Sequence, residues 1–471
     1  MPAITSFGAY IPYYRLKREE IGRAWGGGAP RGEKAVANYD EDSITLAVEA
    51  GRDALHGIDR QSIGGVYFAT TTSPYKEKQG AAVIASALNL KKSVFTVDFA
   101  DSLRAGTNAL RAAMDAVKAG SVNSVLVVAS DCRLGAPGSD YEQVLGDGAV
   151  ALLVGKEGSI DCVSNYTHAS EIIDQWRLSD QPFVKKWEDR FVVTEGYLAD
   201  VKEAVDSFMK TQNMNLKDFN KVALYAPDAR GHKEASKILK LDVKTQAQDP
   251  MLDTIGNTGA AFALLILVAA MEEANAGDKL LLISYGDGCD IMSFQVKEKP
   301  LMDKEYLGVH GHLKSKNYLS NYEKYIKFRG IMDVESGRRR PPQKSSAVAI
   351  HRDRGMIYSL NSSECTSCGR AFFPPQRVCN YCQAKDQFKE VSISERKGKL
   401  FTFSKDLLAS TVDPPLVVSV VNMEGNLRFF TPMTDRDPEK VEIDMSLDLT
   451  FRKMSETEGY CNYFWKCRPV R

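Results

Sequence analysis

Four of the nine cysteines fall into two pairs with the spacing of a metal site. Each pair has the form Cys-x-x-Cys, ten residues separate the pairs, and the four residues are Cys365, Cys368, Cys379 and Cys382. Each pair can turn two thiolates toward one point, and two pairs complete a tetrahedral S4 site that suits zinc. A closed set of four ligands leaves no position for a substrate, so we predict a structural zinc ion. The remaining cysteines stand singly, which is typical of a reducing compartment and predicts a cytoplasmic protein.

The first two thirds of the chain contain an internal repeat. Ala113–Gly120 resembles Ala270–Gly277, which begins 157 positions later (113 to 270). In both copies an apolar helix is expected to end at the Ala-Gly step, and a strand follows, at Val125–Val128 and Leu280–Ile283. Two copies of strand, helix and strand predict a duplicated α/β fold.

Composition excludes some classes of partner. Lysine plus arginine equals aspartate plus glutamate at 61 each, which argues against nucleic acid as the main partner because phosphate binding needs a net basic face. The longest apolar run, Ala260–Met271, is too short for a bilayer span and predicts a buried helix. The first residues, Met1–Tyr14, lack the features of a signal peptide, so we expect no membrane association.

The last third of the chain differs from the rest in its sequence pattern. A basic run before two prolines, Gly337–Pro342, is typical of a solvated linker. From Lys397 onward, short alternating runs such as Leu416–Val421 predict the strands of a small β-barrel.

These features resemble a known family. Residues 1–332 resemble the thiolase superfamily, and most closely its hydroxymethylglutaryl-CoA synthase branch, while residues 333–471 resemble the zinc-ribbon and OB-fold proteins that accompany thiolase-like enzymes as a separate subunit. The matching stretches are Gly32–Val36, Asp40–Ser43, Arg104–Thr107, Ile255–Thr258, Ser284–Gly288, Tyr322–Gly330 and Phe372–Pro375. The resemblance implies a thiolase-type fold layered α-β-α-β-α, a zinc ribbon, a small OB-type barrel, a homodimer and an acyl-CoA substrate. The expected parts are 1–160 and 161–332 for the two thiolase halves, 333–360 for a linker, 361–390 for the zinc ribbon and 391–471 for the OB-type domain.

The chain lacks the catalytic side chains of the family that it resembles. That chemistry uses a cysteine that carries the acyl group, a histidine and a glutamate. The matching positions here hold Leu103, Tyr225 and Thr71, and Asn257 alone is retained, as the oxyanion-stabilising asparagine. Leucine cannot act as a nucleophile, so condensation through an acyl-cysteine is not expected.

An aldol or retro-aldol reaction needs no covalent intermediate. A base removes the proton of a 3-hydroxyl group, the Cα–Cβ bond breaks, and hydrogen-bond donors hold the charge on the thioester oxygen. We therefore expect a cysteine-independent lyase for a 3-hydroxyacyl-CoA, or its reverse. Tyr225 is either the acid or base of this reaction or a core tyrosine whose hydroxyl is satisfied within the protein. Asn257 and the backbone amides near Leu103 and Arg104 are the candidate donors. His232 is either a helper of Tyr225 or a histidine on a helix surface.

Two alternatives remain. A Claisen-type acyltransferase would need a displaced nucleophile, for which Ser102 and Cys132 are candidates. A non-catalytic scaffold would bind acyl-CoA for a partner. Asp98 and Asp101 either supply a base or cap the helix that begins near Arg104. The candidate catalytic positions are Thr71, Asp101, Ser102, Leu103, Tyr225 and Asn257.

Overall fold

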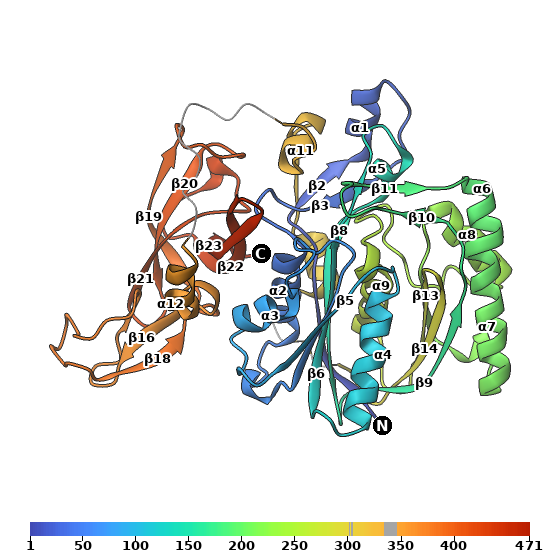
Figure 1. The fold of residues 1–471 in the computed structure, drawn as a ribbon, viewed down its shortest axis with the longest axis horizontal. Coiled ribbons are helices and arrows are strands. Elements are labelled where there is room, and N and C mark those ends of the chain that lie inside the picture. Colours follow the sequence, from blue (N-terminus) through green and yellow to red (C-terminus); the bar gives the residue numbers. More distant parts are fainter. Residues whose placement is uncertain (301, 303–304, 334–345) are drawn as a thin grey trace. The chain divides into compact units, whose positions relative to one another are not determined.

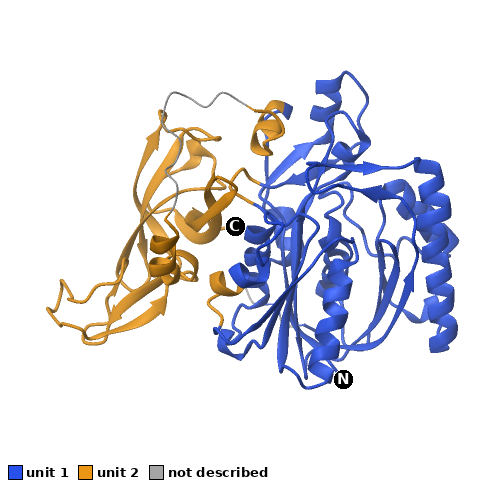
Figure 2. Cartoon of the chain, in the orientation of Figure 1, with its two compact units in different colours: residues 1–37, 42–84, 91–322 blue, residues 38–41, 85–90, 323–471 orange. Residues whose placement is uncertain are grey.

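The computed structural model describes residues 1–300, 302, 305–333 and 346–471. The chain divides into two compact units, coloured separately in Figure 2. Unit 1 comprises residues 1–37, 42–84 and 91–322, and unit 2 comprises 38–41, 85–90 and 323–471. The linker expected at residues 337–342 lies outside the described residues.

Unit 1 is built on a nine-stranded sheet with the order β12-β13-β14-β9-β1-β8-β6-β4-β5. Its strands are β1 (Ala3–Tyr10), β4 (Gly65–Ala69), β5 (Phe95–Phe99), β6 (Ser124–Cys132), β8 (Asp147–Gly155), β9 (Ile160–Ala169), β12 (Lys221–Leu224), β13 (Lys279–Tyr285) and β14 (Gly288–Val296). Strand β1 pairs with β8 along its length but meets β9 at two residues only, so the sheet consists of two halves joined at that point. Two small sheets complete the unit: β2 (Tyr14–Lys17), β3 (Glu33–Val36) and β15 (Asn317–Tyr318) form one, and β7 (Leu134–Gly135), β10 (Gln175–Trp176) and β11 (Phe183–Lys186) form the other.

Helices lie between and outside the two halves of this sheet (Figure 1). The inner helices are α4 (Ala105–Lys118) and α9 (Phe262–Glu273); α2 (Ser43–Ala54) packs on the outer face of the first half, and α7 (Ala199–Gln212) packs on the outer face of the second. Helix α8 (Ala229–Ile238) follows β12. This arrangement is the predicted α-β-α-β-α layering.

The internal repeat is confirmed as a structural repeat. Helix α4 begins at Ala105 and α9 begins at Phe262, 157 positions later (105 to 262). Helix α9 is buried on every side from Phe262 to Met271 because it contacts strands of both halves, which explains its continuous apolar sequence. Gly120 and Gly277, after the two helices, both have the positive φ that favours glycine.

The described residues of unit 2 form two sheets and two α-helices. The three-stranded sheet has the order β17-β16-β18, and the antiparallel five-stranded sheet has the order β21-β20-β19-β22-β23. The strands are β16 (Asn361–Cys365), β17 (Ala371–Phe372), β18 (Phe388–Ser392), β19 (Gly398–Asp406), β20 (Leu416–Met423), β21 (Leu427–Pro432), β22 (Ser446–Thr457) and β23 (Tyr460–Pro469), and the helices are α11 (Tyr322–Phe328) and α12 (Ala347–Tyr358). The strand expected at 416–421 is confirmed as β20, and the OB-type assignment stays a prediction.

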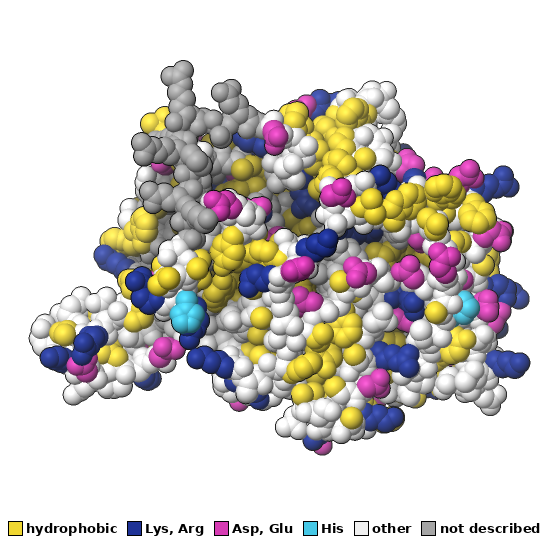
Figure 3. Space-filling model, viewed as in Figure 1, with side chains coloured by type: hydrophobic (Ala, Val, Ile, Leu, Met, Phe, Trp, Pro, Cys, Tyr) yellow, Lys and Arg dark blue, Asp and Glu magenta, His cyan; other side chains and the backbone are white. Residues whose placement is uncertain are grey.

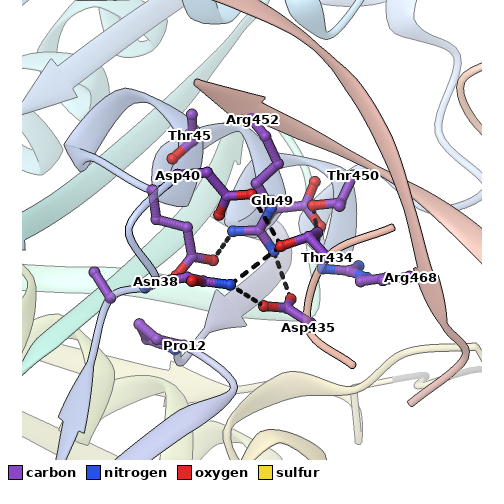
Figure 4. Close-up of polar contacts among 12 residues, drawn as sticks. Pro12, Asn38, Asp40, Thr45, Glu49, Thr434, Asp435, Thr450, Arg452 and Arg468 are labelled. Carbon is purple, nitrogen blue, oxygen red and sulfur yellow. Dashed lines mark hydrogen bonds and ion pairs between the residues drawn. The ribbon is translucent and has the colours of Figure 1, made fainter. Parts of the chain in front are cut away.

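Unit 2 holds a cluster of buried charges, drawn in Figure 4. Arg452 is fully buried and forms ion pairs with Glu41 and, at 2.6 Å, with Asp435. Lys466 pairs with Asp40 at 2.8 Å, and burial of this carboxylate is outweighed by Lys466 and Arg452, which keep the pKa of Asp40 below its ordinary value. The cluster ties residues 38–41 to strands far away in the sequence within the same unit.

The surface carries mixed charge. On the face drawn in Figure 3, acidic and basic side chains are interspersed and neither sign gathers into a large patch. None of the helices in the described part of the chain is long and apolar enough to cross a membrane.

Candidate active site

The position expected for a nucleophile lies in the turn between β5 and α4. Leu103 is 8% exposed, and a side chain at position 286 would come within 2.9 Å of its Cβ atom, so only glycine fits at 286. Arg104 connects this turn to the segment after β13 through hydrogen bonds and an ion pair. Its guanidinium donates to the Gly286 and Asp287 carbonyl oxygens and pairs with Asp290 at 2.9 Å.

Ser102 and Asp98, near this turn, have structural partners. Ser102 donates a hydrogen bond of 2.7 Å to Asp287 and accepts one of 3.2 Å from the Arg104 amide. Asp101 is exposed with a φ of 70°, and α4 has no side-chain cap, so the predicted capping of α4 is wrong. Asp98 instead accepts hydrogen bonds from Gly80 and Ala81, the first two residues of α3 (Gly80–Ala87).

Tyr225 stands directly after β12, in a cluster of aromatic rings. Its ring centroid lies 5.7 Å from that of Phe262, 6.2 Å from that of Tyr285 and 6.4 Å from that of Tyr197. The side chain is 2% exposed. Burial raises the pKa of Tyr225 and outweighs the opposing effects of Arg133 and Asn257. Tyr225 is therefore neutral near pH 7. A tyrosine acts as a base at this pH only if a neighbouring cation lowers its pKa, and the charge of Arg133 lowers the pKa of Tyr225 less than burial raises it.

Asn257 positions Tyr225. Its Nδ2 atom donates to the Tyr225 hydroxyl at 3.1 Å and to the Ala226 carbonyl at 3.2 Å, while its Oδ1 atom accepts from the Gly259 amide at 3.0 Å. Both hydrogens of the amide thus have acceptors within the protein. The predicted role of Asn257 as a direct donor to substrate does not match this geometry, whereas the Tyr225 hydroxyl keeps its own proton for donation.

Thr71 contacts a carboxylate that sequence analysis missed. Asp131, near the end of β6, is fully buried and accepts hydrogen bonds from Thr70, Thr71, Thr72 and the Ala260 amide, at 2.7–2.9 Å. Each carboxylate oxygen is saturated, so Asp131 organises the loop after β4 and the segment before α9. The signal in the sequence was an acidic residue at the end of the otherwise apolar strand Val125–Asp131.

A small pocket that opens to solvent lies over Tyr225. It is lined by Asp140, Tyr141, Val144, Asp174, Gln175, Lys186, Trp187, Asp189, Val192, Val193, Tyr197, Tyr225, Pro227, Asp228 and Tyr285. Asp174 is 6% exposed, and burial raises its pKa although the Gln175 amide donates to it. A carboxyl group with a raised pKa in a pocket is a candidate general base. No motif pointed to Asp174, because it lies in an irregular segment before β10.

Two other candidates lie elsewhere. His232 is buried on α8, so the expected position on the helix surface is wrong. It lines a separate pocket with Lys221 and Gln248, and its role as a helper of Tyr225 stays a prediction. Burial lowers the pKa of His232. Cys132 follows Asp131 on β6, and strand alternation turns its side chain to the opposite face of the sheet.

In unit 2 the structure brings the four paired cysteines together. Their sulfur atoms lie within 4.8 Å of one another, with 3.7 Å between Cys365 and Cys382 and 3.6 Å between Cys368 and Cys379. Metal–sulfur bonds of about 2.3 Å in a tetrahedron require sulfur atoms about 3.8 Å apart, so this geometry fits a zinc ion. The Cys382 amide donates to the Cys379 sulfur at 3.4 Å, which favours the thiolate form.

Known proteins resemble the chain in sequence and in fold. No family model matches it. It is 33% identical over 347 residues to the hydroxymethylglutaryl-CoA synthase of Caldivirga maquilingensis, covering 71% of this chain and 99% of the relative. The corresponding synthase of Pyrococcus furiosus is 29% identical over 336 residues, covering 70% of this chain and 93% of the relative.

Two solved structures show the same fold. An HMG-CoA synthase complexed with CoA has a TM-score of 0.64 at 22% identity, covering 73% of this chain and 95% of that chain. MvaS in complex with 3-hydroxy-3-methylglutaryl coenzyme A has a TM-score of 0.61 at 20% identity, covering 72% of this chain and 94% of that chain. The sequence relationship over nearly the full length of the synthases shows that the chain belongs to the hydroxymethylglutaryl-CoA synthase family of the thiolase superfamily.

Proposed function

We propose that the protein is an acyl-CoA-dependent enzyme that makes or breaks a C–C bond without an acyl-cysteine intermediate. Family membership supports the substrate class, since related structures contain CoA or a CoA thioester. The main support for a reaction without an acyl-cysteine is Leu103, which stands at the position of the nucleophile and cannot form a thioester.

In the cleavage direction the substrate is a 3-hydroxyacyl-CoA. Asp174 accepts the proton of the 3-hydroxyl group, C3 becomes a carbonyl carbon, and the C2–C3 bond breaks. The electron pair moves to the thioester oxygen, which the neutral hydroxyl of Tyr225 holds by a hydrogen bond. The proton held by Asp174 then moves to C2, which yields a shorter acyl-CoA and restores the carboxylate. Synthesis is the same sequence reversed.

Tyr225 is suited to the donor role by its surroundings. Burial keeps its proton in place, and the hydrogen bond from Asn257 fixes the position of its oxygen. A preorganised donor of this kind is worth roughly 3–4 kcal/mol in the barrier.

The first alternative is a covalent acyltransferase that uses Ser102. Its hydrogen bond of 2.7 Å to Asp287 supports this possibility, because a carboxylate can accept the hydroxyl proton. The second alternative, a scaffold that binds acyl-CoA without turnover, would leave Asp174 and Tyr225 without a catalytic task.

Two further features belong to this proposal. The four paired cysteines of unit 2 would bind a structural zinc ion that holds the loops around β16 and β17 together. The protein would form a homodimer through β5, the last strand of the large sheet, where Phe95 is 56% exposed.

The test is incubation of the purified protein with a panel of 3-hydroxyacyl-CoA thioesters, with mass spectrometry of products and of the intact protein. We expect a shorter acyl-CoA plus an aldehyde or ketone, and an unchanged protein mass. An acyl group on the protein would support the covalent alternative and make Ser102→Ala the next variant. Binding of the thioesters without turnover would support the scaffold.

A further inference from the structure

A patch of large apolar side chains lies exposed beside the pocket over Tyr225. Ile173, Trp187 and Phe191 are 61%, 56% and 49% exposed, and Trp176 is half-buried. We call these four residues the apolar rim. Figure 3 shows hydrophobic side chains gathered over the part of the surface where Figure 1 labels β10, β11 and α6 (Asp189–Phe191). A contiguous apolar patch on a protein surface typically marks a binding site.

The apolar rim is continuous with the pocket. Trp187 itself lines the pocket, and the ring centroids of Trp176 and Trp187 lie 6.0 Å apart. Phe191 directly precedes Val192, which also lines the pocket. A ligand that fills the small pocket and extends out of it therefore meets apolar side chains.

The backbone holds the apolar rim next to Asp174. Ile173 directly precedes this aspartate, and the Trp187 amide donates a hydrogen bond of 3.0 Å to the Asp174 carbonyl oxygen. After Phe191 the chain continues as a π-helix, Val192–Leu198, an uncommon element that often occurs at functional sites. The rim is thus fixed by regular backbone contacts beside the proposed base.

The charges of the pocket disfavour an anionic group at its opening. Among the described residues that line the pocket are four aspartates and a single lysine. The lysine, Lys186, pairs with Asp140 at 3.0 Å and with Asp189 at 2.6 Å, so carboxylates of the protein already neutralise its charge. A carboxylate or phosphate of a ligand would be repelled by the remaining negative charge. A neutral apolar group avoids this repulsion and gains from burial against the rim.

The proposed reaction decides which part of a substrate reaches the apolar rim. Asp174 takes the proton of the 3-hydroxyl group, so C3 of the acyl chain lies at this carboxylate. The group that C3 carries beyond the hydroxyl is then closest to the neighbours of Asp174 in the structure, which include Ile173 and Trp187. This is the group that leaves as part of the aldehyde or ketone in the cleavage direction.

We propose that the apolar rim binds a bulky, uncharged hydrocarbon group on C3 of the acyl chain, so that the substrates of this pocket are acyl-CoA thioesters with an apolar far end. This inference rests on the proposed acyl-CoA function and names the substrate class of the same site. Trp187 and Phe191 are its specificity-determining residues, while Asp174 and Tyr225 act on the carbon atoms between the apolar group and the thioester.

The test compares three thioesters by isothermal titration calorimetry. Butanoyl-CoA, glutaryl-CoA and 3-phenylpropanoyl-CoA carry a methyl, a carboxymethyl and a phenyl group on C3, and none is cleaved because all lack the 3-hydroxyl group. We expect the unmodified protein to bind 3-phenylpropanoyl-CoA at least about 10-fold more tightly than butanoyl-CoA, because the ring buries more apolar area. Glutaryl-CoA should bind no more tightly than butanoyl-CoA.

The variants remove exposed parts of the apolar rim. In Trp187→Ala the affinities for 3-phenylpropanoyl-CoA and butanoyl-CoA should come within about 3-fold of each other, mainly by loss of the former. Phe191→Ala should lose part of the preference, which gives a second result where Trp187→Ala does not fold. Leu408→Ala, an equally apolar and exposed position in unit 2, should keep the full preference.

Free 3-phenylpropanol, followed by saturation-transfer NMR, separates this inference from the proposed function. Binding of all three thioesters with equal affinity would overturn the role of the rim and leave the acyl-CoA function intact. Trp187-dependent binding of the alcohol without binding of any thioester would support the rim as an apolar site and overturn the acyl-CoA function. Absence of binding by all four compounds would overturn both.

The other possible occupant of the apolar rim is a second copy of the chain. Light scattering of the same variants tests it. A lower molecular mass of Trp187→Ala together with unchanged affinities for the three thioesters would assign the rim to a contact between copies and overturn the proposal. An unchanged mass together with the loss of preference for 3-phenylpropanoyl-CoA would support it.

Discussion

The side-chain amide of Asn257 donates a hydrogen bond of 3.1 Å to the hydroxyl of Tyr225, across 32 positions of sequence. This contact joins the loop before α9 to the residue after β12, two segments of the second half of the repeat. It fixes the position of the Tyr225 hydroxyl beside the pocket. In the proposed reaction, Asn257 would therefore act on the substrate only through Tyr225.

We predict that Tyr225→Phe lowers kcat by about 100- to 1000-fold, because the donor to the thioester oxygen is lost. Asn257→Ala should lower kcat less and leave KM nearly unchanged. The double variant should be no slower than Tyr225→Phe, since both changes act through one hydroxyl. Steady-state kinetics of the three variants tests this prediction, with the exposed Asn275→Ala as a control. Additive losses would show that Asn257 acts independently of Tyr225.

The pH dependence of the rate should report Asp174. Burial raises its pKa, so its basic form appears at a higher pH than for an ordinary aspartate of pKa about 3.9, and kcat/KM should rise with pH through that raised value. Asp174→Asn should remove this rise and lower kcat/KM about 100-fold or more. Asp180→Asn, an exposed change in the same segment, should keep the full profile. An unchanged profile in Asp174→Asn would exclude this carboxylate as the base.

The cysteine cluster should hold one zinc ion per chain, measured by elemental mass spectrometry. Cys379→Ser should lose the metal and lower the melting temperature, because a structural zinc contributes directly to folding. Cys461→Ala, a buried cysteine outside the cluster, should keep the metal. Full zinc content in Cys379→Ser would contradict a site of four thiolates.

The homodimer should depend on Phe95. We expect Phe95→Glu to convert the dimer to a monomer in light scattering after size exclusion, because a charge on the edge strand opposes pairing of strands. Val243→Glu, a similarly exposed position on another surface, should remain dimeric. A dimer in both variants would place the interface elsewhere.

Removal of one partner from the buried ion pairs of unit 2 should lower the stability of the protein. Arg452→Met removes a buried cation from Glu41 and leaves Asp435 with Arg471 as its ion-pair partner, which is expected to lower the free energy of unfolding by roughly 3–5 kcal/mol. Urea denaturation followed by the fluorescence of Trp465, a fully buried tryptophan of the same unit, measures the change. Arg428→Met, an exposed arginine on β21, should shift stability by less than about 1 kcal/mol.

Features encoded in short stretches of sequence were predicted well. The repeat gave α4 and α9, together with the strands that follow them, because helix periodicity and apolar runs are local properties. The Cys-x-x-Cys pairs predicted the cluster for the same reason, since each pair turns two thiolates within one loop. Leu103 in place of a nucleophile was also visible from its neighbours along the chain.

Tertiary structure alone decided which side chains meet around Tyr225. Asp131 and Arg133 come from the end of β6, Asp174 and Gln175 come from an irregular segment, and none belongs to a motif. Their surroundings follow from burial and from partners far away in the sequence: Asp131 accepts hydrogen bonds from several donors, burial raises the pKa of Asp174, and Arg133 donates to Gln175. The sequence by itself determined the elements of the fold and the absent cysteine. The charge and proton state of the pocket depend on desolvation and on long-range contacts, which exist only in the folded chain.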